Sequence, residues 1–450
     1  MAAAPVELEL GDVQGLVARG YGSLKAASFL LLGLEDAAAA RRWLGTALDS
    51  ITSGDERPES RAVNLAFTSA GLARLGLSPE VLQQFSNEFV NGMTTEHRRR
   101  ILGDLGDDAP EHWDWGGPST AAVGAVLLLY ARDPAELERL LEEQSRLLVT
   151  AGVEVQRKLD TSDLDGFEPF GFRDGISQPF VEGLSKTGPG GQTVRAGEFV
   201  LGYVNEHGHY TDQTLLNAAD AVGKNGTYLV FRQLEQDVRG FWRFLEEIAA
   251  DPAERTRLAA KMVGRWPGGA PLALSPDRDD PELAEQNDFG YFHEDRDGAR
   301  CPIGAHVRRT NPRDSLDPQP GSDKSLAINR RHRLLRRGRE YGRALTSEQA
   351  LTEPLTAHEE ERGLHFICLN ANIARQFEFV QGTWLNNPKF AALYDDSDPL
   401  VGQSDPYGGT FTVQAKGVRT RIGGVPRFVS VKGGAYFFLP GLRALRSLAS

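Results

Sequence analysis

The sequence predicts an α+β protein made of two ferredoxin-like α/β sandwich halves, of the dimeric α+β barrel type. Two observations lead to this fold class. The first half reads as strand–helix–strand twice over, which is the order of a ferredoxin-like unit, and the second half repeats that order with long insertions. In addition, 450 residues are too many for one ordinary small core. We therefore expect residues 1–190 and 191–450 to form two halves that pack face to face.

The N-terminal half carries clear periodicity. Apolar runs bounded by polar or glycine-rich segments indicate strands, and apolar residues at helical spacing indicate the helices between them. The predicted strands cover residues 26–32, 62–67, 121–130 and 153–157, and the predicted helices cover 35–48, a segment from about 69, and 135–148.

The C-terminal half shows the same alternation, although no sequence repeat is visible and its duplication rests on element order alone. Its predicted strands cover residues 198–204, 227–231, 363–369 and 434–439, and its predicted helices cover 239–248, 252–263 and 373–384. Residues 275–343 interrupt it with a stretch rich in charge, proline and glycine that contains three histidines. A long irregular segment inside a compact protein is usually functional or disordered, and the density of histidine and arginine favours a site.

Composition excludes several classes of protein. The net charge of −12 argues against a general nucleic-acid binder, because phosphate binding requires a cationic surface. Cys301 and Cys368 are too few for a disulfide framework or a four-cysteine metal site, which favours a reducing compartment. No apolar stretch approaches the roughly 20 residues that span a bilayer. With no export signal visible at the start, we expect a cytoplasmic protein without membrane or nucleic-acid partners.

Three short segments contain residues suited to chemistry, and each is weak evidence alone. Asp174 lies between glycines in GFRDG, where aspartate is common in turns. His306 lies in GAHVRRTNPR, and a lone histidine is more often structural than a ligand. Arg336 lies in the run HRLLRRGREYG, and such a run in an acidic protein is usually a solvated surface.

Together the segments identify a family. GFRDG resembles the GxxDG signature of dye-decolourising peroxidases, while CPIGAHVRRTNPR and HRLLRRGREYG resemble that family's proximal-histidine and distal-arginine segments, in the same order. Similar matches in DVQGL, RGYGSLKAASFLLL, AFTSAGLARLGL, GLHFICLNANIARQFEFVQGTW and GGAYFFLPG extend the resemblance over almost the whole chain. The long insertions resemble those of the larger bacterial and fungal members.

The resemblance implies one haem b per chain, held in the C-terminal half. His306 matches the proximal iron ligand, Asp174 the distal acid and base, and Arg336 the distal arginine, with Arg333 and Arg337 as the nearest alternatives. The chemistry supports this set independently. Heterolytic cleavage of an O–O bond needs a carboxylate to move a proton, and it needs a fixed cation for the charge on the departing oxygen.

Supporting positions follow from the same resemblance. Leu364 and Phe366 match apolar residues that line the distal side, although ordinary strand core explains them equally well. Glu378 is the candidate acceptor for the second ring nitrogen of His306, because a ligating histidine usually has such a partner. Gly338 stands where compact members carry an asparagine, which puts a third polar distal group in doubt.

The implied function is a haem peroxidase that reduces hydrogen peroxide through a ferryl intermediate and oxidises dyes, phenols or other small aromatic donors. Two alternatives remain open at this point: a haem-handling protein with little turnover, and a haem-free interaction module. Were His306 not the ligand, His332 and His293 would be the next candidates. The sequence does not specify the oligomeric state, and a homo-oligomer is left open.

Overall fold

A computed structural model describes residues 7–184, 188, 192–212, 215, 222–356, 360–403 and 408–450 of the chain. Its main feature is a nine-stranded sheet with the strand order β4-β1-β3-β2-β13-β7-β10-β8, in which β9 also pairs with β10. None of the described helices is long and apolar enough to cross a membrane.

The N-terminal half is a ferredoxin-like unit. Its strands form the antiparallel order β4-β1-β3-β2, and helices α2 and α7 provide the two crossovers. The strands are β1 (Ala26–Gly33), β2 (Arg61–Phe67), β3 (Ala125–Ala131) and β4 (Glu154–Asp160), and the helices are α2 (Ala37–Ala47) and α7 (Pro134–Ala151). Between β2 and β3 lie α3 (Ser69–Arg74), α4 (Pro79–Leu82), α5 (Asn87–Asn91) and α6 (Glu96–Leu102).

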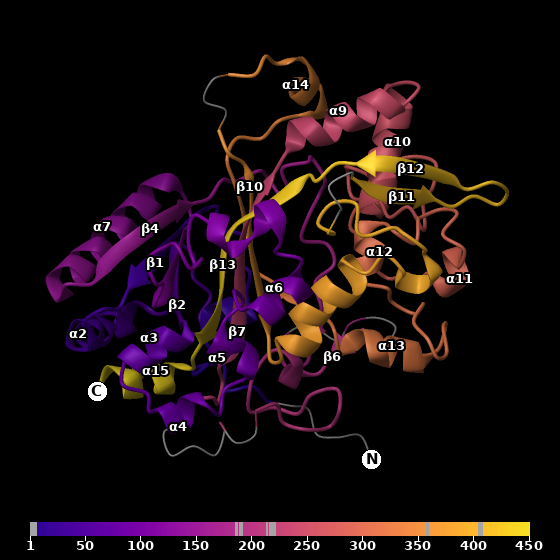
Figure 1. The fold of residues 1–450 in the computed structure, drawn as a ribbon. Helices are drawn as coiled ribbons and strands as arrows, with labels where there is room; N and C mark the ends of the chain where they lie inside the picture. Colours follow the sequence, from indigo (N-terminus) through magenta and orange to yellow (C-terminus); the bar gives the residue numbers. More distant parts are fainter. Residues whose placement is uncertain are drawn as a thin grey trace.

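The C-terminal half repeats this order, since β13-β7-β10-β8 has the same relation to the chain as β4-β1-β3-β2. Its strands are β7 (Thr227–Gln236), β8 (Leu335–Arg336), β9 (Arg339–Tyr341), β10 (Gly363–Asn370) and β13 (Val429–Leu439). Its helices include α9 (Val238–Ile248), α10 (Pro252–Val263), α11 (Phe292–Asp295), α12 (His306–Thr310), α13 (Asp323–Arg330) and α14 (Ser347–Thr352). A hairpin of β11 (Gly409–Val413) and β12 (Thr420–Val425) extends from this half (Figure 1).

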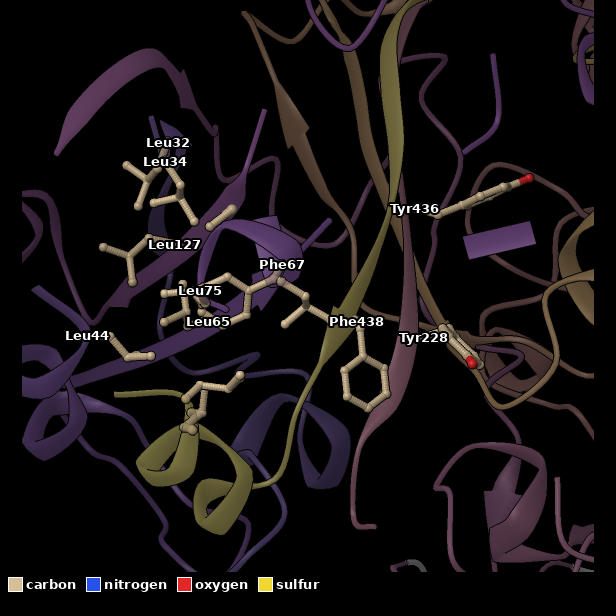
Figure 2. Packing of buried hydrophobic residues seen from close by; sticks show 14 of the residues in the cluster. Leu32, Leu34, Leu44, Leu65, Phe67, Leu75, Leu127, Tyr228, Tyr436 and Phe438 are labelled. Carbon is tan, nitrogen blue, oxygen red and sulfur yellow. The ribbon is translucent and has the colours of Figure 1, made fainter. Parts of the chain in front are cut away.

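The two halves are joined at one sheet edge and also share a core. Phe67 of β2 pairs with Phe438 of β13, so the nine strands are continuous. Figure 2 shows Phe438 between the leucines of the N-terminal half and Tyr228 of β7. The opposite faces of the two strand sets meet in a second buried cluster, in which Phe29 and Phe231 pack with ring centroids 5.8 Å apart. The predicted face-to-face packing of two ferredoxin-like halves is confirmed.

The C-terminal helix α15 (Leu442–Ala449) returns to the N-terminal half. Its apolar residues Leu442, Leu445 and Leu448 join the core that contains Trp43 of α2. Figure 1 shows α15 beside the helices of the first half. The division of the chain at residue 190 stays a prediction, but the last helix packs outside the half to which the sequence assigned it.

Two predicted elements differ from the structure. The strand predicted for residues 198–204 is wrong, because this segment forms the 3₁₀ turn η5 (Ala196–Glu198) followed by further turns. Phe199, Val200 and Leu201 are buried in it, and a short apolar run does not distinguish a buried strand from a buried turn. The helix predicted for residues 373–384 exists as two π-helical segments, η7 (Ala374–Glu378) and η8 (Val380–Leu385).

Candidate active site

A cavity of about 290 Å³ lies against the face of the C-terminal sheet that turns away from the N-terminal strands. Alternate residues of β7 and β10 form one wall, among them Leu234, Leu364 and Phe366. The predicted residues Asp174, His306 and Arg336 line the same cavity, together with Leu364 and Phe366. The structure therefore brings together five of the six predicted site residues, which come from four separate segments.

Asp174 reaches the cavity from the loop that connects the two halves. Gly171 and Gly175 have φ values of 95° and 81°, a left-handed conformation that glycine adopts without strain. Below this loop, Glu168 accepts hydrogen bonds from the backbone N–H groups of Phe170 (3.1 Å) and Phe172 (2.9 Å) and from the Gln236 side chain (2.8 Å). The two glycines and the Glu168 carboxylate thus fix the loop that presents Asp174.

Arg336 lies on β8, where it pairs with Cys368 of β10. Its Nη1 atom donates to Oδ1 of Asp174 at 2.7 Å. Neighbouring residues of a strand point to opposite faces, and Arg337 accordingly donates to the carbonyls of Leu16 (2.6 Å) and Val17 (2.9 Å) in the N-terminal half. Of the alternatives left open by the sequence, Arg337 is thus directed away from the cavity.

Asp174 and Arg336 each stabilise the charged form of the other. Burial alone would raise the pKa of Asp174, but the charge of Arg336 and its hydrogen bond outweigh this effect and lower the pKa below the ordinary value. The charge of Asp174 likewise raises the pKa of Arg336. The two side chains keep 34% and 31% of their surface accessible, and both line the cavity. An ionised carboxylate and a fixed cation therefore stand side by side at neutral pH.

His306 is the first residue of α12. Its Nδ1 atom lies 3.0 Å from Oδ2 of Asp398, whose side chain is fully buried. Oδ1 of Asp398 accepts from the backbone N–H groups of Leu400 (3.0 Å) and Val401 (2.9 Å). No hydrogen bond within the described residues involves Nε2 of His306, and the ring remains 29% accessible. The bond to Asp398 thus leaves Nε2 as the nitrogen available to a ligand in the cavity.

The expectation that Glu378 accepts from His306 is wrong, because Asp398 occupies that position. Glu378 instead binds Nη1 of Arg98 through both oxygens (2.6 and 2.8 Å) and accepts from the hydroxyl of Tyr436 at 2.8 Å. Its neighbours Phe377 and Val380 line the cavity. Glu378 therefore anchors the π-helical wall of the cavity to α6 and β13.

The remaining predicted positions have clear structural roles. His332 contacts the carbonyl of Arg375 (2.6 Å) and stacks on Phe379, and His306 is the only described histidine that lines the cavity. A Cβ atom at Gly338 would lie 2.5 Å from the carbonyl oxygen of His365. The close approach of β10 therefore excludes any side chain at this position, including the asparagine of compact family members.

Two neighbouring cations lack an acidic partner within the described ranges: Arg333 lines the cavity, and Arg313 lies with it around a small adjoining pocket. Arg333, which lines the cavity, donates to the carbonyl of Ser177 at 3.0 Å, and Arg313 donates to the carbonyls of Asn287 and Phe289. Neither guanidinium forms an ion pair with any carboxylate in the described ranges. Burial and the charges of Arg313 and Arg336 lower the pKa of Arg333 to about 9. Such a site suits an anionic group, and the two propionates of haem are carboxylates.

Asp398→Asn should weaken haem binding by about 10- to 100-fold, because the carboxylate orients the ring of His306 and keeps its Nε2 basic. Titration of haem into the haem-free protein, followed by absorption, measures the change. Asp395→Asn is the matched control, since Asp395 lies in the same segment but forms an exposed ion pair with Arg421. Equal affinities of wild type and Asp398→Asn would contradict the assigned role.

No family model matches the sequence. The chain is 31% identical over 481 residues to Peroxidase 2 of Mycetinis scorodonius, covering 100% of this chain and 89% of the relative. It is 32% identical over 492 residues to a dye-decolorizing peroxidase of Mycena epipterygia, covering 98% of this chain and 87% of the relative.

Solved structures agree with these relatives. An ancestral D-type dye-decolorizing peroxidase superposes with a TM-score of 0.82 at 30% identity, covering 99% of this chain and 100% of the other. A fungal DyP-type peroxidase from Auricularia auricula-judae gives a TM-score of 0.83 at 27% identity, with the same coverage. The chain therefore belongs to the family of dye-decolourising, or DyP-type, haem peroxidases.

Proposed function

We propose that this chain binds one haem b, with His306 as the proximal ligand, and uses it to reduce hydrogen peroxide while it oxidises dyes, phenols or other small aromatic donors. The observation that carries the proposal is the 2.7 Å pair of Asp174 and Arg336 in the same cavity as His306. A protein that only handles haem needs the histidine, whereas the distal pair serves peroxide chemistry.

The residues that line the cavity fit haem. Nε2 of His306 is free to bind iron, and Arg333, which lines the cavity and forms no ion pair in the described ranges, would offer its charge to a propionate. Leu364 and Phe366 supply an apolar wall beside Asp174 and Arg336. Bound haem would supply the iron that takes up peroxide and would give up the two electrons that reduce it, and the aromatic donors would replace these electrons one at a time.

Asp174 acts first as a base and then as an acid. Its lowered pKa keeps the carboxylate ionised, so it can accept the proton of the inner peroxide oxygen and return it to the outer oxygen, which leaves as water. The hydrogen bond from Arg336 holds the carboxylate in place during both transfers. Arg336 remains cationic throughout and stabilises the charge that develops on the departing oxygen.

We also propose that the enzyme is cytoplasmic and has no nucleic-acid partner. A cytoplasmic location is supported by Cys301 and Cys368, which are free and buried thiols. The absence of nucleic-acid partners is supported by the net charge of −12.

The test is turnover by the haem-loaded protein. We expect one equivalent of peroxide to change the haem absorption spectrum, and a phenol or a dye to restore it with oxidation of the donor. A spectrum that does not respond to peroxide would contradict the proposal and favour the haem-handling alternative. A protein that gains no haem absorption near 400 nm after haem addition would contradict both.

A further inference from the structure

Arg309 lies three residues after His306 on α12 and is completely buried. Nε donates to the carbonyl of Gly304 at 3.2 Å, and Nη1 donates to the carbonyls of Trp384 (2.6 Å) and Asn387 (3.2 Å). Nη2 donates to the carbonyl of Asp396. One guanidinium therefore connects the segments before His306, at the end of η8 and before Asp398.

The charge of Arg309 is not cancelled by a direct ion pair in the described part of the chain. Its partners are carbonyl oxygens, and the ring of Phe390 lies 5.2 Å from its Cζ atom. A buried unpaired cation is costly, so its retention calls for an explanation. The nearby carboxylates are Asp398, which holds His306, and Asp396, whose Oδ2 is buried without a hydrogen-bond partner.

The influence of this charge reaches the His306–Asp398 pair. Arg309 lies on the same helix as His306, and its guanidinium donates to the carbonyls of Gly304, two residues before His306, and of Asp396, two residues before Asp398. A carboxylate that accepts the Nδ1–H bond increases the electron density of a ligating imidazole. A cation near the carboxylate stabilises its negative charge. The carboxylate then pulls less strongly on the Nδ1 proton, and the imidazole gains less electron density.

We propose that Arg309 is a positioning residue of the proximal side, which holds Asp398 in line with His306 and uses its fixed charge to limit how strongly this histidine donates electrons to haem iron. This inference rests on the proposed role of His306 as the ligand. Arg309 thus joins His306 and Asp398 as a third residue of the proximal side, and its charge tunes the reduction potential.

The test compares Arg309→Gln, which removes the charge, with Arg309→Lys, which keeps it. The measurements are the ferric/ferrous midpoint potential and the iron–histidine stretching frequency of the haem-loaded protein by resonance Raman spectroscopy. We expect Arg309→Gln to lower the potential and raise the frequency, because Asp398 then pulls more strongly on the Nδ1 proton. Arg309→Lys should retain most of the wild-type values, even if the loss of the planar fork lowers thermal stability.

The neighbouring Arg308 provides the matched control. It is also buried on α12, but it forms an ion pair with Asp295 at 3.1 Å and stacks on Tyr291. Arg308→Gln should lower stability and leave the potential and the stretching frequency close to wild type. Equal shifts in the Arg308 and Arg309 variants, or no shift in Arg309→Gln, would overturn the proposal.

Asp396→Asn tests the same idea if Arg309→Gln does not fold. This change removes the second carboxylate beside Arg309, so the guanidinium acts more strongly on Asp398, and we expect the potential to rise and the frequency to fall. An unchanged potential and frequency in Asp396→Asn would then overturn the proposal. A wild-type protein without an iron–histidine band would instead refute His306 as the ligand, which separates this failure from that of the inference.

Discussion

Asp174→Asn should reduce the second-order rate of the peroxide-driven change in haem absorption by about 10²–10⁴-fold, because asparagine keeps the shape of the side chain but cannot accept the proton. Stopped-flow absorption measures the rate. Because Arg336 lowers the pKa of Asp174, the wild-type rate should be retained as the pH falls to the ordinary aspartate pKa of about 3.9, and be lost only at lower pH.

The control for this prediction is Asp165→Asn, which makes the same chemical change at a fully exposed position of the same connection. A second variant separates the two distal residues. Arg336→Leu should reduce the rate by about 10²–10³-fold through the loss of charge stabilisation. If both distal variants reacted at the wild-type rate with haem bound, the assignment of the distal pair would fail.

Arg98→Met should lower the free energy of unfolding by about 3–5 kcal/mol, because it leaves the buried carboxylate of Glu378 without its cation. Arg98 on α6 binds Glu378 at 2.6 Å and Glu88 at 3.1 Å, and only the hydroxyl of Tyr436 would remain on Glu378. Urea unfolding of the haem-free protein, followed by circular dichroism, measures the change.

Two controls test the cause of this loss. Arg99→Met removes the next arginine of α6, whose ion pair with Glu111 is partly exposed, and should cost no more than about 1 kcal/mol. The double change of Arg98 and Glu378 to methionine removes both charges and should recover much of the stability. A double variant as unstable as Arg98→Met would show that the cost does not arise from the unpaired carboxylate.

Most of the fold could be predicted because its signals are local. The strands around Leu30, Leu65 and Leu127 are long apolar runs, and α2 and α7 show regular helical spacing beside them. Strands β8 and β9 could not be predicted, because they carry no such local signal. They contain two and three residues inside a charged insertion, and their pairing with β10 is set by contacts that periodicity does not record.

The site residues likewise include some that a local motif identifies and others that only the folded chain reveals. Asp174, His306 and Arg336 lie in short motifs with a recognisable order, so the resemblance identified all three as site residues. The structure places them in one cavity. Asp398 has no motif of its own. It is one of 62 acidic residues and lies 92 positions from His306, so only the folded chain could distinguish it from Glu378. Arg309 was hidden similarly, because its partners are backbone carbonyls, which leave no mark on the sequence.

Haem binding through His306 is most directly tested by the absorption spectrum of wild type and His306→Ala after titration with haem. We expect wild type to take up one haem per chain with a band near 400 nm, and His306→Ala to retain much less haem, because no other described histidine lines the cavity. Full haem occupancy and an unchanged spectrum in His306→Ala would contradict the assignment of the ligand, and with it the arrangement of distal and proximal residues described above.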